Sequence, residues 1–179
     1  MKLKILIVIR YISLFFLFYC SISVAEEREV VGWLEMSRIY PGDLKIRAKM
    51  DTGAKSSSLH APDLIQFERD GKSWVRFSIS DKNKRDEEKK VTIEREISQV
   101  IKIKRKEGGA DERLVIQIGI CIGNIYKEVK VNLVDRSHFN YQLLIGRDDL
   151  AENFNVFVNP AATFTKKPKC FKQKKSDPH

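Results

Sequence analysis

The sequence has only three cysteines among its 179 residues, too few for a scaffold built on disulfides. It contains no run of repeats. Hydrophobic residues make up 42% of the chain, which is too many for a disordered protein. The length suits one compact domain and is too short for two large ones. We therefore predict a single globular body.

Several motifs that carry catalytic or binding chemistry are also missing. There is no His-Glu-x-x-His motif and no Cys-x-x-Cys pair, and the three histidines, at positions 60, 138 and 179, are far apart. No Gly-x-Ser-x-Gly elbow and no phosphate-binding loop occur. We therefore expect no bound metal, no nucleotide and no other cofactor.

The net charge of +9 comes almost entirely from the two ends of the chain. Between residues 26 and 165, 24 Lys and Arg stand against 23 Asp and Glu. A nucleic-acid-binding domain needs a basic face on its folded body. The nearly neutral body argues against nucleic acid as a partner.

Residues 1–25 have the pattern of a secretory signal peptide. A short basic start is followed by the apolar stretch 5–22 and by Ser23-Val24-Ala25, whose small residues suit signal peptidase. We expect cleavage before Glu26 and a periplasmic protein. The alternative is an uncleaved membrane anchor, which would have to tolerate Arg10 within the span.

Export would leave two cysteines in an oxidising compartment. Cys121 and Cys170 can pair there. Equally, Cys121 can be a buried strand thiol and Cys170 part of a loose tail. The sequence leaves both alternatives open.

The body of the chain reads as all β. Apolar and charged residues alternate strictly over 44–50, which predicts a half-buried strand. Asp70-Gly71 predicts a hairpin turn between strands at 65–69 and 74–80. Further strands are expected at 30–36, 91–104, 114–122, 125–134, 143–145 and 154–158, the last ended by Asn159-Pro160.

The segments between and after the strands are assigned by composition. Residues 147–153 have room for a single helix of about two turns. The charge run 81–90 is expected to be a solvated hairpin tip, and 104–111 a flexible connection. We place the domain at 26–165 and a basic, disordered tail at 166–179.

The strongest candidate for chemistry is Asp51-Thr52-Gly53, directly after the alternating strand. A strand end holds a carboxylate rigidly, the Thr52 hydroxyl can lock the turn, and Gly53 permits close approach of another backbone. Aspartic proteases need two such carboxylates, one to activate water and one, protonated, to polarise the peptide carbonyl. The same three residues also make a good plain turn, with Asp51 as a capping acid.

A longer series of motifs resembles a known family. The stretch 46–61 resembles the signature of bacterial retropepsin-like domains labelled ATP-dependent zinc protease, and the stretches 112–116, 133–136 and 143–147 match further motifs of that family. The resemblance covers roughly residues 30–160. Asn159 departs from it, since an acid is expected there.

The resemblance implies a closed β-barrel with a catalytic Asp51 supported by Thr52 and Gly53. Leu144, Ile145 and Gly146 would form the strand that packs beside the Asp51 loop. Relatives occur with glutamate ligases that modify ribosomal protein or with transglutaminase-like membrane proteins, and the export signal fits the second group. The zinc and ATP of the family's label find no matching residues in this chain.

Substrate contacts are expected around this loop, and several have a simpler alternative. Arg113, Arg136 and Arg147 recur in the motifs and can form a carboxylate-binding patch for an acidic peptide. The alternative is ordinary pairing with neighbours such as Asp135, Asp148 and Asp149. The remaining candidate substrate contacts are Ala54, Lys55 and His60, although for His60 we favour a hydrogen-bonded core histidine.

The sequence supports two kinds of function. The first is an aspartic endopeptidase that acts on a peptide or protein substrate. Because the chain has one Asp-Thr-Gly loop, we expect a homodimer that pairs the two Asp51 residues across its axis. The second is a non-catalytic domain that binds a peptide strand within an envelope complex.

Overall fold

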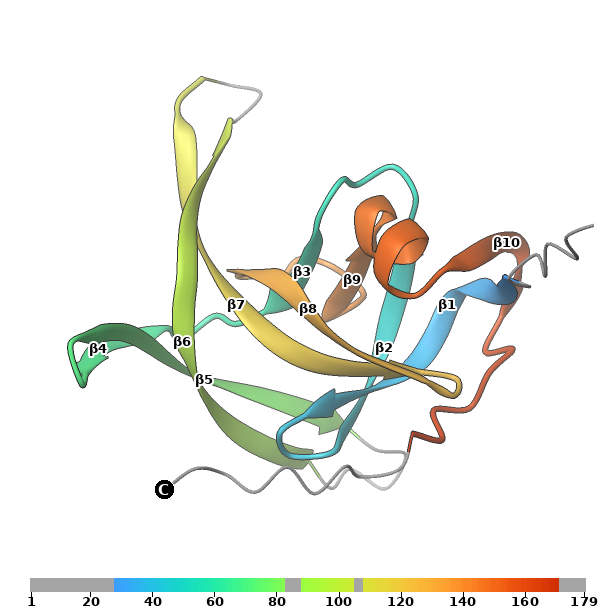
Figure 1. Cartoon of the computed structure of the whole chain (residues 1–179), viewed down its shortest axis with the longest axis horizontal. Coiled ribbons are helices and arrows are strands. Elements are labelled where there is room, and N and C mark those ends of the chain that lie inside the picture. The colour runs from blue at the N-terminus through green and yellow to red at the C-terminus, as the bar shows by residue number, and fades with distance from the viewer. Residues whose placement is uncertain (1–27, 83–87, 105–107, 171–179) are drawn as a thin grey trace, which may run out of the picture.

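The computed structural model describes residues 28–82, 88–104 and 108–170, and these are almost entirely strands (Figure 1). This confirms the all-β class. The strands of the described ranges are β1 (Glu29–Tyr40), β2 (Leu44–Asp51), β3 (Ser57–His60), β4 (Ile65–Arg69), β5 (Lys72–Lys82), β6 (Glu88–Lys104), β7 (Ala110–Ile122), β8 (Ile125–Val134), β9 (Leu143–Gly146) and β10 (Val156–Thr163).

Six of these strands close into a barrel. They are hydrogen-bonded in the order β1-β2-β9-β3-β8-β7, and β7 returns to pair with β1. The pairs β2–β9 and β3–β8 are parallel, whereas the other pairs of the ring are antiparallel. Outside the ring, β10 adds to β1, while β6, β5 and β4 extend the sheet from β7. The predicted closed retropepsin-like barrel is therefore present.

The alternating strand shows how the sequence specifies the core. Leu44, Ile46, Ala48 and Met50 of β2 are buried, and the charged residues between them face outward or stay half-exposed. They pack with the apolar faces of the other barrel strands into one cluster. Each fully buried Leu or Ile side chain contributes roughly 1.5–3 kcal/mol, so this row fixes the register of β2 and with it the position of Asp51.

Two tight turns, among them the one predicted at Asp70-Gly71, are found where Gly or Asp takes positive φ. Asp70 and Gly71, with φ of 51° and 72°, form the hairpin turn between β4 and β5. Gly42, with φ of 99°, turns the chain from β1 into β2. A Cβ at Gly42 would lie 2.4 Å from Cγ1 of Val91, so this turn also packs closely against β6.

Strand β10 differs from the prediction. It continues through Asn159 and Pro160 to Thr163, whereas we had placed its end at Asn159-Pro160. This strand lies at the edge of the sheet and pairs only with β1, where proline is tolerated because one side of the strand is free of ladder bonds. Asn159, which departs from the family pattern, accepts a hydrogen bond from the N–H of Ala161 at 2.9 Å.

The expected helix after β9 is present, but most of it is wider than an α-helix. The wider part is a single π-helical turn, Asp149–Asn153 (η1), closed by the N–H of Phe154 donating to the Asp149 carbonyl at 2.8 Å. The wider turn accompanies the burial of Asp149, whose carboxylate binds Ser57 and Asn153. Side-chain bonding of this kind competes with regular helix geometry.

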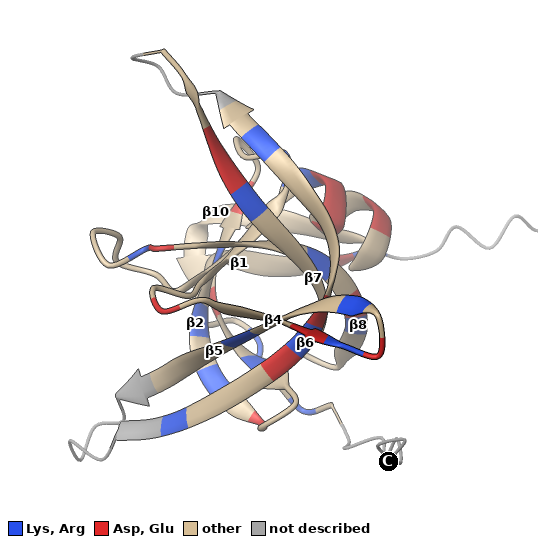
Figure 2. Cartoon of the chain, turned by 90° about the vertical axis from the view of Figure 1, so that its left-hand side faces the viewer, with Lys and Arg blue, Asp and Glu red and all other residues tan. Residues whose placement is uncertain are grey.

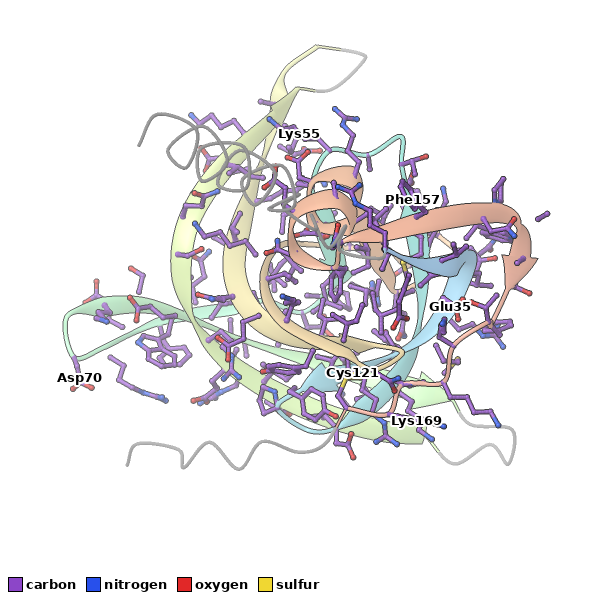
Figure 3. The ribbon with its side chains drawn as sticks, turned by 45° about the vertical axis from the view of Figure 1, so that its right-hand side comes forward. Glu35, Lys55, Asp70, Cys121, Phe157 and Lys169 are labelled. Carbon is purple, nitrogen blue, oxygen red and sulfur yellow. A yellow bond between two sulfur atoms is a disulfide. The ribbon has the colours of Figure 1, made fainter. Side chains whose placement is uncertain are left out.

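The chain after β10 is ordered beyond residue 166, where we had predicted that a disordered tail begins. Cys170 forms a disulfide with Cys121 on β7, so of the two alternatives for these cysteines pairing is the one found. The N–H of Lys169 donates to the Gly123 carbonyl at 2.7 Å, beside the disulfide near the lower edge of Figure 3. Residues 166–170 are therefore held against the barrel, and the disordered tail predicted from 166 is wrong for these five. The rest of the tail, 171–179, lies outside the described residues.

The signal peptide or anchor predicted at 1–25 also lies outside the described residues, as do the centres of the two connections, 83–87 and 105–107. Within the described part, no helix has the length and apolarity needed to cross a membrane. Positive and negative residues lie beside one another on the strands turned toward the viewer in Figure 2. That distribution agrees with the nearly neutral body counted from the sequence.

Candidate active site

Asp51 is the last residue of β2 and lies opposite Gly146 in the parallel register with β9. One carboxylate oxygen, Oδ1, accepts the N–H of Gly53 at 3.1 Å. The other, Oδ2, accepts Nζ of Lys49 at 3.0 Å. With its side chain 21% exposed, Asp51 is held in one orientation while still reachable from solvent.

The loop after Asp51 is pressed against the end of β9. The N–H of Arg147 donates to the Ala54 carbonyl at 2.9 Å, and that of Asp148 to the Lys55 carbonyl at 3.2 Å. A Cβ at Gly146 would lie 2.5 Å from the carbonyl carbon of Ser56 and 2.6 Å from the carbonyl oxygen of Lys55. Only glycine leaves room for the loop backbone to pass this close to Gly146. The strand Leu144-Ile145-Gly146 therefore fixes the position of the loop that follows Asp51.

Beneath the loop lies a buried polar layer that the sequence did not reveal. The Ser57 hydroxyl donates to the buried Asp149 carboxylate and accepts the N–H of Gly146 at 3.0 Å. Nδ2 of Asn132 donates to the Ser57 carbonyl at 2.6 Å. Asn132 alternates with the apolar residues Val131 and Leu133, a pattern typical of a solvent-facing position, but it is buried too. The three serines before Leu59 were the available signal, since a polar run entering an apolar strand needs partners.

Arg136 lies within electrostatic reach of Asp51 and of a second arginine, Arg113. Nη1 of Arg136 donates to Oγ of Ser58 at 2.8 Å and its Nε to the Tyr141 carbonyl at 3.0 Å. Nη1 of Arg113 donates to Oδ1 of Asn132 at 3.1 Å, but its buried Nε has no hydrogen-bond partner. Burial lowers the pKa of Arg136, the charge of Arg113 lowers it further, and the charge of Asp51 opposes this.

These contacts differ from the ordinary pairing considered for the arginines. Asp135 accepts hydrogen bonds from its own turn at Ser137, and Asp149 is bound to Ser57 and Asn153. The guanidinium groups of Arg113 and Arg136 are bound by neutral oxygens instead. Among the described residues, no carboxylate is bound between these two like charges, which is an arrangement suited to an anionic ligand.

The other predicted substrate contacts are spread more widely. Thr52 and Lys55 are exposed on the loop, and Ala54 is half-buried there. Nη1 of exposed Arg147 donates to the Gly53 carbonyl at 3.3 Å, so this arginine braces the loop from outside.

His60 has a supporting role. Its Nδ1 accepts the backbone N–H of Arg136 at 2.9 Å, as the hydrogen-bonded alternative required. Burial lowers the pKa of His60 below 6.5, and the nearby charge of Asp135 opposes the shift.

The surroundings of Asp51 favour its charged form. Partial burial acts to raise the pKa of its carboxyl, but the hydrogen bond and charge of Lys49 and the N–H groups of Gly53 and Ala54 outweigh it. The pKa of Asp51 therefore lies below its ordinary value of 3.8. At neutral pH this residue is an oriented carboxylate that can accept a proton from water.

Zinc, which the label of the resembling family would imply, does not fit the residues that the structure describes. Among them no group of three or more His, Cys, Asp or Glu side chains could hold a metal ion. Structural and catalytic zinc sites need three or four such ligands.

The closed mixed barrel, with an Asp-Thr-Gly loop crossed by a glycine-ended strand, defines a retropepsin-like domain. The model of the RimB-like family, described as retropepsin-like aspartic endopeptidase RimB, matches residues 30–169, and the chain belongs to this family.

Similar proteins carry two kinds of description. A protein of unknown function from Legionella pneumophila has a crystal structure with a TM-score of 0.66 and 33% identity, covering 79% of this chain and 100% of that one. Proteins named probable alpha-L-glutamate ligase from Shewanella pealeana and Shewanella halifaxensis are 32% and 33% identical, each over 66% of this chain. The chain spans only 25% of the length of these two relatives.

Proposed function

We propose that the chain is an aspartic endopeptidase in which Asp51 activates the attacking water. The observation that carries this proposal is the Asp51 carboxylate, ionised, oriented at a strand end and open to solvent. In the reaction Asp51 takes a proton from water as the hydroxyl adds to the peptide carbonyl. The proton then passes to the leaving nitrogen as the carbon–nitrogen bond breaks.

The second carboxylate comes from a second copy of the chain. The chain has a single Asp-Thr-Gly loop, and a two-fold symmetric dimer places the same surface of each copy against the other. Asp51 of one copy would then face Asp51 of its partner. Two carboxylates in direct contact share one proton, because they cannot both be charged. The protonated carboxyl polarises the substrate carbonyl.

The substrate we propose is an acidic peptide, as glutamate-rich segments are. The support is the pair Arg113 and Arg136: the charges of their guanidinium groups repel one another, and Arg136 also interacts with the charge of Asp51. A substrate carboxylate between them would relieve that repulsion and gain charge-assisted hydrogen bonds. The glutamate ligase names of the relatives point to the same chemistry, and the exported location predicted from 1–25 points to an envelope system related to transglutaminase-like proteins.

The test uses purified protein from Glu26 onward and a library of peptides with and without acidic residues. We expect cleavage near acidic residues, loss of cleavage in Asp51→Asn with an unchanged circular dichroism spectrum, and a dimer in sedimentation. Cleavage by a monomer at low protein concentration would contradict the paired mechanism. Binding of acidic peptides without cleavage, unaffected by Asp51→Asn, would establish the non-catalytic binding domain instead.

A further inference from the structure

Lys49 holds the candidate catalytic carboxylate from within the same strand. Side chains two residues apart on a strand point to the same face, so Lys49 and Asp51 are neighbours on the outer face of β2. Nζ of Lys49 lies 3.0 Å from Oδ2 of Asp51, and the N–H of Gly53 holds Oδ1. Both carboxylate oxygens are therefore bound by groups of their own chain.

We propose that Lys49 is a positioning residue of this site, which fixes the orientation and negative charge of Asp51 and thereby sets the pH range in which the peptidase works. The inference rests on the proposed function, because it assigns Lys49 a role in the same reaction. Lys49 lies within the stretch 46–61 that resembles the family signature, but the sequence did not mark it as a site residue, and its ion pair with Asp51 comes from the geometry.

The charges around Asp51 show why Lys49 dominates. Lys49 contacts the carboxylate directly from β2, while Arg136 after β8 acts on it only through space. Arg147, after β9, is bound to the Gly53 carbonyl. The Lys49 side chain is 40% exposed, so its ammonium group keeps part of its hydration while it forms the pair.

In a site of two Asp51 residues, like-charge repulsion raises the upper pKa of the pair. Each chain brings its own Lys49, and the two ammonium groups offset part of that repulsion. The form that shares a single proton is then populated at lower pH than in a carboxylate pair without lysines. We therefore expect both limbs of the pH–activity profile to lie at lower pH than they would without Lys49.

The experiment compares Lys49→Met, Lys49→Arg and a matched control, Lys45→Met. Lys45 is an exposed residue on the same face of β2, four positions earlier. It precedes Asp51 by six residues, so at about 3.3 Å per residue it lies about 20 Å from Asp51, beyond the screening length of about 10 Å at about 0.1 M salt. The readouts are the titration of the Asp51 carboxyl carbon by NMR and the pH dependence of kcat and kcat/KM.

In Lys49→Met we expect the Asp51 titration and both activity limbs to shift to higher pH. Lys49→Arg should restore the wild-type values, and Lys45→Met should leave them unchanged. An unshifted titration in a folded, active Lys49→Met protein would overturn the role of Lys49 alone. A wild-type chain that cleaves nothing would overturn the proposed function, even where NMR still shows the lysine's effect on Asp51.

Discussion

Thr165 is tied to the completely buried carboxylate of Glu35 by both its backbone N–H and its hydroxyl, with donor–acceptor distances of 2.9 Å and 2.5 Å. The same carboxylate accepts the N–H of Gly32 at 2.7 Å and that of Lys166 at 3.1 Å. One side chain on β1 thus satisfies four donors, three of them from the segment that follows β10. Glu35 and this segment lie side by side in Figure 3.

Glu35→Ala should therefore destabilise the fold strongly. The change removes four hydrogen bonds, one of them buried and three partly buried, and at about 0.5–1.5 kcal/mol for each bond we expect a loss of roughly 3 kcal/mol in the free energy of unfolding. Glu29→Ala is the matched control, because Glu29 bonds Lys166 of the same segment at an exposed position. Such a pair contributes about 1 kcal/mol or less. Urea unfolding measures both, and equal losses would contradict the buried role of Glu35.

The disulfide should contribute to stability through the loop that it closes. Cys121 and Cys170 are 49 residues apart, and closing a loop of that size stabilises by about 4 kcal/mol on the chain-entropy relation. Cys170→Ser should lower the melting temperature of protein that starts at Glu26, and reductant should do the same to the wild type. Reductant should leave Cys170→Ser unaffected. A wild-type melting temperature that is insensitive to reductant would show that the bond is not formed.

Gly146→Ala should damage both stability and activity. Its Cβ would overlap the backbone of Ser56 and Lys55, which cannot yield without moving the Asp51 loop. Gly119→Ala is the comparison, since its Cβ would lie 2.4 Å from the hydroxyl of Tyr126, the end of a side chain that can turn away. We expect a clearly larger loss of stability and of cleavage for Gly146→Ala. Similar losses in thermal melts of the two variants would count against the tight crossing.

His60 should make stability depend on pH. Its pKa is lowered in the folded state, so the unfolded chain binds more protons below about pH 6.5, and stability should fall as the pH drops through that value. Protonation at Nδ1 also removes the acceptor for the N–H of Arg136. His60→Asn keeps an acceptor that does not titrate, so its unfolding free energy should change less between about pH 7 and about pH 5. The same pH slope in both proteins would exclude His60 as the cause.

The elements that the sequence predicted well are those governed by neighbouring residues. The alternation over 44–50 and the Asp70-Gly71 turn act over a few positions, and both elements formed as expected. The end of β10 was missed because the edge position of Pro160 depends on pairing with β1, more than a hundred residues earlier.

The candidate site divides in the same way. Asp51, Thr52 and Gly53 were found as a local motif, and Gly146 through the family resemblance. The hydrogen bonds from Ser57 to Asp149 and from Asn132 to Ser57 join residues that are 92 and 75 positions apart. The sequence around each residue does not indicate which distant residue is its partner. The burial of Asn132 was likewise invisible, since asparagine on an alternating strand normally marks the solvent face.

The crossing of the Asp51 loop by the end of β9 also controls when the site can exist. Gly53 and Arg147, which touch there, are 94 residues apart in the sequence. A chain that emerges from the ribosome exposes Asp51 long before it exposes Gly146, and contacts so distant in sequence form late in folding. The incomplete chain carries the Asp51 carboxylate without the strand that positions it, so the candidate site is not assembled until residues Leu143–Gly146 have been synthesised.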